Sequence, residues 1–246
     1  ILPERDGIYV DGTAGGGGHS YEILKRLSDK SRLICFDKDE TAVDVCKERF
    51  KDFGEKVTVI HADFKNIKYE LNKIGINNID GFIADLGVSS YQLDTANRGF
   101  SYMQDAPLDM RMDMSIDNTI DITAKYIVNN YSVEKLERIF FDYGEEKFSK
   151  RIANKIDEVR MKEEINTTLQ LVKIIKSALP GIALKEKQHP AKRCFQAIRI
   201  EVNGELDNLK DALNDLPGLL NKNGRIGIIT FHSLEDRIVK QFYVEK

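Results

Sequence analysis

The sequence predicts an α/β protein, namely a parallel sheet with helices on both faces and an inserted all-helical domain. Four short apolar runs between residues 8 and 85 alternate with amphipathic stretches, and they are continuous, as in strands buried on both faces. Residues 115–187 show helical spacing throughout, and the mixed pattern then resumes. We therefore expect three segments: a ligand-binding core at 1–112, an inserted helical domain at 113–188, and a second core part at 189–246.

The first strand, at residues 8–10, ends in Asp11 and leads through four glycines, 15–18, into a helix that opens at His19. Glycines let a ligand approach the backbone, and a helix start offers unpaired N–H groups, so this order is typical of phosphate or nucleotide binding. No lysine follows the glycines, which argues against a nucleoside triphosphatase, and the third glycine of a dinucleotide fingerprint falls on Ser20. A plain tight turn is the alternative.

The second strand, residues 32–37, ends in Asp37, which lies 20 residues after Gly17. An acid at this spacing suits the two hydroxyls of a ribose. We therefore predict a nucleoside ligand with an unphosphorylated ribose.

A helix at 38–50, a strand at 56–61, a helix at 67–74 and a strand at 79–85 complete the first part. In parallel sheets, ligands collect beyond the carboxyl ends of the strands. The side chains that follow the four strands should therefore converge on one site: Asp11, Asp37, Asp63 with Phe64, and Asp85.

Residues 89–113 show no sustained period and are too apolar for disorder, which predicts a packed active-site loop. Helices are expected at 123–131, 132–142, 145–162 and 167–179, with Ser132 and Thr167 or Thr168 as N-caps. After them we expect helices at 191–203 and 205–216, a turn at 221–224, a strand at 225–231, and a helix that opens at 232.

The overall composition narrows the class of protein. A net charge of −3 argues against non-specific coating of nucleic acid, although it permits a local basic face. Cys35, Cys46 and Cys194 lie far apart and form no disulfide or metal pattern, which indicates a reducing cytoplasm. No run approaches the roughly 18 apolar residues of a membrane helix, so we expect no membrane partner. The chain begins at Ile1 rather than Met and stops after an apparent helix, so we expect segments beyond both ends.

The strongest candidate for chemistry is Asp85, in Asp-Leu-Gly-Val-Ser-Ser at 85–90. Enzymes that methylate exocyclic amines place an acid or amide and neighbouring carbonyls here, which orient a weakly nucleophilic nitrogen toward a sulfonium methyl group. An N-cap role is the alternative. His19 and His232 lie at strand-to-helix turns, where a structural hydrogen bond is the commoner role.

We predict no metal site. The four histidines form no pattern typical of zinc. Asp105, Asp109 and Asp113 fit neither an EF-hand nor one helix face, so solvation or pairing with Arg111 is the better interpretation.

Residues 185–199 carry five basic residues against one acid. Together with a basic helix, they are expected to bind a phosphate backbone. Three aromatics of the loop are expected to stack on an unpaired base. The alternative is that the lysines are solvated and the aromatics belong to the core. The helix residues are Lys147, Lys150, Arg151 and Lys155, and the aromatics are Tyr91, Phe100 and Tyr102.

Eight blocks together resemble the bacterial small-subunit rRNA cytosine-N4-methyltransferases, which use S-adenosylmethionine. The resemblance covers essentially the whole chain. The blocks are Asp-Gly-Thr-x-Gly-x-Gly-Gly-His at 11–19, Asp-Leu-Gly-Val-Ser-Ser-x-Gln-Leu-Asp at 85–94, Arg-Gly-Phe-Ser-Tyr at 98–102, Ala-Pro-Leu-Asp-Met-Arg-Met-Asp at 106–113, Tyr-Gly-Glu-Glu-Lys-Phe at 143–148, His-Pro-Ala-Lys-Arg at 189–193, Phe-Gln-Ala-Ile-Arg-Ile-Glu-Val-Asn at 195–203 and Phe-His-Ser-Leu-Glu-Asp-Arg at 231–237.

The resemblance implies a Rossmann-like class I methyltransferase sheet with an inserted helical domain that recognises the substrate. It implies transfer to a cytosine in the decoding region of 16S rRNA, with the small ribosomal subunit as partner and the cytoplasm as location. The family has a short segment before the first residue here and a basic tail beyond the last. By motif position, the cofactor would be bound by Gly17, Gly18, His19, Asp37 at its ribose, Phe64 at its adenosine, Asp85 and Gln92, with Asp85 also catalytic.

Two other functions remain open at this level. A nicotinamide-dependent oxidoreductase has the same fold, although the missing third glycine and the 85–88 block speak against it. A non-catalytic ribosome-assembly factor would tolerate Asp85→Ala. The oligomeric state is also open, a dimer included.

Overall fold

The computed structural model describes residues 6–115 and 122–245 of the chain. The chain divides into two compact units, which we describe separately. The sheet unit comprises residues 6–89, 113–115 and 205–245. The helical unit comprises residues 90–112 and 122–204.

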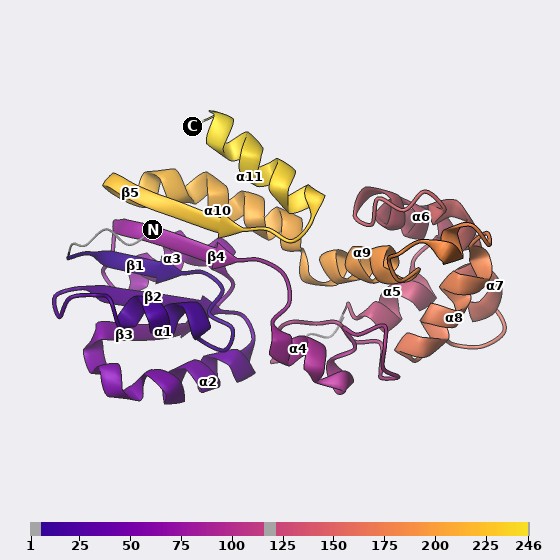
Figure 1. Ribbon diagram of the computed structural model, residues 1–246, viewed down its shortest axis with the longest axis horizontal. Coiled ribbons are helices and arrows are strands. Elements are labelled where there is room, and N and C mark those ends of the chain that lie inside the picture. Colours follow the sequence, from indigo (N-terminus) through magenta and orange to yellow (C-terminus); the bar gives the residue numbers. More distant parts are fainter. Residues whose placement is uncertain (1–5, 116–121, 246) are drawn as a thin grey trace. The chain divides into compact units, whose positions relative to one another are not determined.

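The sheet unit contains a five-stranded parallel sheet in the order β3-β2-β1-β4-β5 (Figure 1). This confirms the predicted α/β fold with a Rossmann-like parallel sheet. The strands are β1 (Ile8–Asp11), β2 (Arg32–Asp37), β3 (Val57–His61), β4 (Ile79–Asp85) and β5 (Leu220–Ile229).

Helices cover both faces of this sheet because successive residues of each strand point to opposite sides. In β2, Leu33 and Cys35 join one buried cluster, whereas Ile34 and Phe36 join the other. The first cluster contains residues of α1 (Gly18–Leu24) and α2 (Glu40–Phe50). The second contains residues of α3 (Ile67–Lys73), α10 (Glu205–Leu219) and α11 (Ser233–Glu245). Short 3-10 turns, η1 (Lys51–Lys56) and η2 (Phe64–Asn66), flank β3.

The strand order creates a switch point between β1 and β4. From β1 the chain moves outward through β2 to β3, and it then returns to place β4 on the other side of β1. Loops at the carboxyl ends of β1 and β4 therefore lead away in opposite directions, and in open α/β sheets ligands bind at such a switch point. The loop after β1 is residues 12–17, and the loop after β4 begins at residue 86.

From residue 124 to residue 203 the helical unit consists of successive helices, as the 3.6-residue pattern predicted, and the irregular loop up to residue 112 packs with them. Both predicted N-caps are present: Ser132 Oγ accepts the N–H of Lys135 at 3.2 Å, and Thr167 forms a capping box with Gln170. The elements are α4 (Ser90–Asp94), η3 (Ala96–Arg98), α5 (Ala124–Asn130), α6 (Val133–Asp142), α7 (Ser149–Arg160), α8 (Thr168–Ala178), η4 (Ala183–Lys185) and α9 (Lys192–Asn203).

The observed units divide the chain at other places than the segments expected from the sequence, 1–112, 113–188 and 189–246. The loop at 90–112 and helix α9 both lie in the helical unit. Asn203 at the end of α9 explains this, because its side chain donates to Met110 O and accepts the N–H of Met112, both at 2.8 Å. Helix α9 also packs on α5 and α6.

Three element boundaries also differ from the predicted ones. Glu145 has φ +49°, which no α-helix contains, so α7 starts at Ser149 rather than at residue 145. Strand β5 runs from Leu220 to Ile229, so the turn expected at 221–224 lies inside it and the strand ends before the predicted residue 231. Its pairing with β4 is irregular between Ile79 and Gly81. The loop 89–113 contains α4 and η3, which are too short to produce a period in the sequence.

Candidate functional site

The glycine loop after β1 has the backbone that a ligand-binding turn requires. Gly15 and Gly17 have φ values of +50° and +76°, in the left-handed region that favours glycine. A Cβ on Gly17 would also stand 2.6 Å from Phe50 Cζ, whereas a Cβ on Gly16 or Gly18 would meet nothing within 4 Å. The loop is therefore packed on one side and open on the other, where Gly18 and His19 begin α1.

Asp37 lies next to this loop and fixes its shape. Its carboxylate accepts the N–H of Gly15 at 2.7 Å and the N–H of Asp39 at 2.8 Å. Burial raises the pKa of Asp37 from its ordinary 3.8, and these two N–H donors partly offset the rise. Each oxygen accepts one of these bonds, and a carboxylate oxygen has two lone pairs, so Asp37 keeps acceptor capacity for a ribose.

Asp11 ends β1 at the same edge but points into the protein. It is 2% exposed, and it accepts hydrogen bonds from Thr13 N–H at 3.0 Å and from Ser20 Oγ–H at 2.6 Å. Burial raises the pKa of this carboxyl as well. Asp11 therefore holds the start of the loop rather than facing a ligand.

Asp63 and Phe64 follow β3 at the same edge of the sheet. Asp63 caps η2 through Lys65 N–H at 3.0 Å and accepts a hydrogen bond from Asn208 Nδ2 at 2.8 Å. Phe64 is half-buried, and its Cβ would lie 3.3 Å from a Cβ added to Gly12. The structure thus places Phe64 beside the glycine loop, as an adenosine-lining role requires.

Asp85 lies at the carboxyl end of β4, next to β1. Its backbone N–H donates to Thr13 Oγ1 at 2.6 Å, and Oδ2 stands 3.7 Å from His19 Nδ1. Oδ1 is buried, and within the described part of the chain it has no hydrogen-bond partner. A buried acceptor without a donor is costly, so Oδ1 is placed to receive a donor from a ligand.

Thr13 is a residue of this site that the sequence interpretation overlooked. Its hydroxyl joins the loop after β1 to the end of β4 through Asp85 N–H. The signal was available, because Thr13 directly follows the glycine after a strand-ending acid. The N-cap alternative for Asp85 does not apply, since α4 begins only at Ser90.

Gln92 belongs to the helical unit, where it lies in α4 and is 6% exposed. The other six predicted cofactor residues, Gly17, Gly18, His19, Asp37, Phe64 and Asp85, all lie in the sheet unit along the carboxyl ends of β1 to β4. The structure therefore brings these six together within one unit, and the role of Gln92 stays a prediction.

Asp105, Asp109 and Asp113 are the three acids for which the sequence raised a role as cation ligands. Arg111 donates to Asp109 through Nε at 2.9 Å and Nη2 at 2.8 Å, so the expected pairing is confirmed for Asp109. Within residues 6–115 and 122–245, no group of three His, Cys, Asp or Glu side chains is arranged to hold a metal ion.

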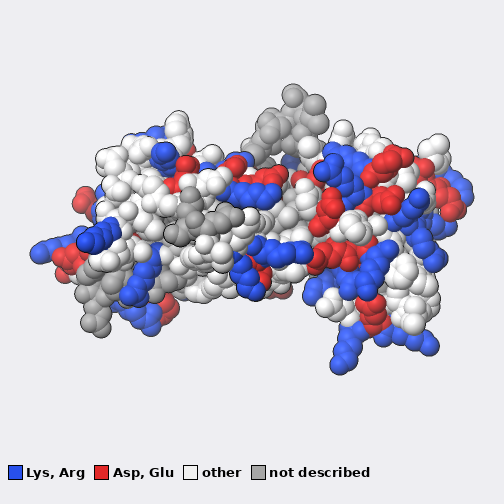
Figure 2. All heavy atoms as spheres, turned by 90° about the horizontal axis from the view of Figure 1, so that it is seen from above, with Lys and Arg blue, Asp and Glu red and all other residues white. Residues whose placement is uncertain are grey.

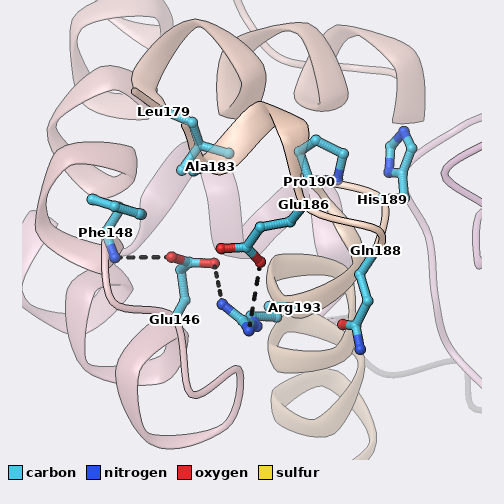
Figure 3. A pocket seen from close by; sticks show the side chains of 9 residues that line it. All are labelled: Glu146, Phe148, Leu179, Ala183, Glu186, Gln188, His189, Pro190 and Arg193. Atoms are coloured by element: carbon cyan, nitrogen blue, oxygen red, sulfur yellow. Dashed lines mark hydrogen bonds and ion pairs between the residues drawn. The ribbon is translucent and has the colours of Figure 1, made fainter. Parts of the chain in front are cut away.

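The helical unit contains a small hollow of about 320 Å³, part of it open to solvent (Figure 3). Glu146, Glu186 and Arg193 point toward one another in it, with Arg193 Nη1 3.8 Å from Glu146 and Nη2 3.9 Å from Glu186. Glu146 is 3% exposed and accepts the N–H of Phe148 at 2.8 Å. The blocks at 143–148 and 189–193 therefore meet through an ion pair within this unit.

The candidate aromatics for base stacking have different environments. Phe100 is 6% exposed, so its expected stacking role is wrong and it belongs to the core. Tyr102 stacks on His189, with ring centroids 4.6 Å apart and planes 10° from parallel. Tyr91 is 54% exposed and keeps a face for a partner.

Basic and acidic side chains are interspersed on the face that Figure 2 shows, so neither unit presents a surface of one charge there. Twelve cations nevertheless lie on α7, α8, η4 and α9 and the segments just before α7 and α9, and eight of them are exposed. The exposed ones are Lys147, Lys150, Arg151, Lys173, Lys176, Lys185, Lys187 and Lys192, and the partly exposed ones are Lys155, Arg160, Arg193 and Arg199. No described helix is long and apolar enough to cross a membrane.

Comparisons with known proteins agree with the motif blocks. The curated ribosomal RNA small subunit methyltransferase H of Clostridioides difficile (strain 630) is 54% identical over 238 residues, which are 97% of this chain and 75% of that protein. The ribosomal RNA small subunit methyltransferase H 2 of Agathobacter rectalis is 56% identical over 236 residues, 96% of this chain and 74% of that protein. The corresponding protein of Finegoldia magna is 54% identical over 244 residues, 98% of this chain and 77% of that protein.

A solved rRNA methylase from Streptococcus thermophilus is 25% identical over 34% of this chain and 47% of that chain, with a TM-score of 0.29. A family model described as the MraW methylase family matches residues 1–246. The family model and the three curated relatives confirm the resemblance drawn from the eight blocks, and the chain belongs to the MraW methylase family.

Proposed function

We propose that this chain transfers a methyl group from S-adenosylmethionine to the exocyclic N4 amine of a cytosine in the decoding region of 16S rRNA. The observation that carries the proposal is Asp85 Oδ1, a buried acceptor without a partner in the described residues, at the switch point beside an open glycine loop. Membership of a methylase family and relatives named small-subunit rRNA methyltransferases support it.

The residues at this edge suit the cofactor. Gly17 gives the turn its left-handed backbone, Gly18 leaves the backbone accessible, Asp37 has acceptor capacity for the ribose hydroxyls, and Phe64 offers an aromatic surface for the adenine. His19 stands at the start of α1, between this loop and Asp85. When bound, S-adenosylmethionine supplies an electrophilic methyl group on a sulfonium sulfur.

Asp85 acts on the acceptor amine. Its Oδ1 accepts an N–H of the cytosine amine, which orients the nitrogen lone pair. The nitrogen would form a bond to the methyl carbon while the carbon–sulfur bond breaks. The electron pair of the broken bond would stay on sulfur. The nitrogen then gives its surplus proton to the Asp85 carboxylate, from which it passes to water. Thr13 keeps the backbone of Asp85 in place throughout.

The helical unit provides the RNA contact. Its exposed cations on α7, η4 and α9 suit a phosphate backbone, and Tyr91 suits an unpaired base. The assembled small subunit is the expected partner, and the enzyme therefore works in the cytoplasm.

The test is transfer of labelled methyl from S-adenosylmethionine to small subunits purified from cells that lack this protein, with naked 16S rRNA in parallel. We expect label in N4-methylcytidine, and we expect Asp85→Ala to lower the rate by at least about 100-fold. The matched control is Asp44→Ala, which removes an exposed acid of α2 and should leave the rate unchanged.

Three results would contradict the proposal. Wild-type protein that binds S-adenosylhomocysteine but labels neither RNA would show that the substrate is wrong. An Asp85→Ala protein with full activity would remove the catalytic role, and a protein without activity that still supports ribosome assembly would favour the assembly-factor alternative.

A further inference from the structure

Phe231 is a large apolar side chain that stays exposed at the end of a buried strand. It is 69% exposed and lies two residues beyond the end of β5. The β4–β5 pairing matches Asp85 with Ile229, and Leu86 N–H continues it with a 3.0 Å bond to Ile229 O. Phe231 therefore leaves the sheet at the same edge as Asp85, on the neighbouring strand.

The ring of Phe231 lies against Gly87. A Cβ built on Gly87 would stand 3.7 Å from Phe231 Cδ2, an ordinary contact distance. Gly87 has φ +93°, a backbone conformation that residues with a Cβ rarely adopt. The segment 85–87, whose acid receives the target amine in the proposed reaction, thus has an aromatic ring beside it.

Hydrogen bonds and an ion pair with buried residues fix the backbone at Phe231. Its N–H donates to Glu235 Oε2 at 2.8 Å, and Glu235 is 2% exposed. His232 Nε2 lies 3.2 Å from Glu235 Oε1, and His232 O accepts the N–H of Asp236 at 3.1 Å. The turn is therefore held by buried polar groups while the ring itself remains at the surface.

We propose that Phe231 stacks on the ring of the target cytosine and holds its N4 amine at Asp85. The inference rests on the proposed function and adds the residue that fixes the plane of the base. Every base offers a π-face to an aromatic side chain, and a base that leaves its helix loses its stacking neighbours. A preformed aromatic ring replaces them without a cost for ordering the turn.

The kinetic test compares Phe231→Leu and Phe231→Tyr in methyl transfer to small subunits. We expect Phe231→Leu to lose roughly 10- to 100-fold in kcat/KM and Phe231→Tyr to keep most of it. The affinity for S-adenosylhomocysteine and the melting temperature should stay unchanged in both, because the ring is exposed and faces the base. The matched control is Tyr69→Leu, an aromatic of α3 that is 65% exposed in the same unit.

A binding test does not depend on catalysis. The chain contains no tryptophan, so Phe231→Trp creates a single fluorescent reporter at this position. With S-adenosylhomocysteine present, a decoding-region oligonucleotide should quench its fluorescence, and the same oligonucleotide with an abasic site at the target position should not. Tyr69→Trp should respond to neither.

The inference is overturned if Phe231→Leu keeps its activity within about twofold, if its loss is matched by weaker cofactor binding, or if both oligonucleotides leave the fluorescence unchanged. If wild-type protein transfers no methyl group but the cytosine-dependent quenching occurs, the proposed reaction fails and the stacking stands. If wild-type protein is active and Phe231→Leu is too, only the stacking fails.

Discussion

At the scale of single residues, burial decides which polar groups hold the site and which face a ligand. Asp11 and Asp37 are braced by N–H or O–H donors, whereas Oδ1 of Asp85 has none in the described residues. The same distinction separates the aromatics, since Phe100 is buried and Phe231 is exposed. Residue type alone distinguishes neither Asp85 from Asp11 and Asp37 nor Phe231 from Phe100.

Cys46 gives a prediction at this scale. Its thiol lies beside the glycine loop, 3.3 Å from Gly15 O, and burial raises its pKa from 9.0 to about 12. Only the thiolate reacts, so at pH 8 its fraction is lower by about a thousandfold than that of an ordinary thiol. We expect Cys46 to resist a thiol reagent between pH 7 and 9, with the rate rising as the pH approaches 12.

The measurement is labelling by iodoacetamide followed by peptide mapping. Val45→Cys on the exposed side of α2 serves as the control and should be labelled at an ordinary rate. Fast labelling of Cys46 in the native protein would mean that α2 opens from the glycine loop.

At the scale of elements, the residues at the ends of strands and helices shape the site more than the residues in their middles. The loop after β1 is tied to its neighbours by Gly12 N–H to Ile83 O at 2.8 Å and by Ala14 N–H to Phe36 O at 2.9 Å. These two bonds reach β4 and β2, so the loop at residues 12–17 is fixed by the strands on both sides.

Gly17→Ala tests this loop. The left-handed φ of +76° and the 2.6 Å approach to Phe50 Cζ should together lower the free energy of unfolding by roughly 1–3 kcal/mol. Gly16→Ala is the matched control, because its Cβ would meet nothing within 4 Å, and it should change stability by less than about 0.5 kcal/mol. Urea unfolding of both variants measures the difference, and equal stabilities would refute the packing argument.

At the scale of the whole molecule, the sheet unit is assembled from segments that are distant in sequence, namely residues 6–89, 113–115 and 205–245. Its two hydrophobic clusters lie on opposite faces of the sheet, and both combine residues from more than one element. The termini described, residues 6 and 245, both belong to the sheet unit.

A cofactor that binds one unit should stabilise that unit more than the other. At 100 times its Kd, a ligand adds about 2.7 kcal/mol to the form it binds. With S-adenosylhomocysteine, amides in β1 and β4 should therefore exchange roughly 100-fold more slowly, while those of α6 and α8 change little. Hydrogen exchange with mass spectrometry measures this, with ligand-free protein as control, and equal protection in both units would mean that they open as one.

The sequence by itself determined the α/β class, all five strands, the helical insertion, and the acids that end β1, β2 and β4. These follow from local patterns, since period and strand-end position depend on neighbours along the chain. The strand-end positions of Asp37, Phe64 and Asp85 and the motif block with Gly17, Gly18 and His19 also predicted that these six residues share one edge of the sheet.

Only the tertiary structure decided the rest. Helix α9 belongs with the helical unit because Asn203 bonds to Met110 and Met112, and Thr13 positions Asp85 across 72 residues of sequence. The burial of Phe100 and the exposure of Phe231 likewise depend on which segments the folded chain brings alongside them. A sequence pattern reports the face on which a residue lies, but its partner across the fold is set by the path of the whole chain.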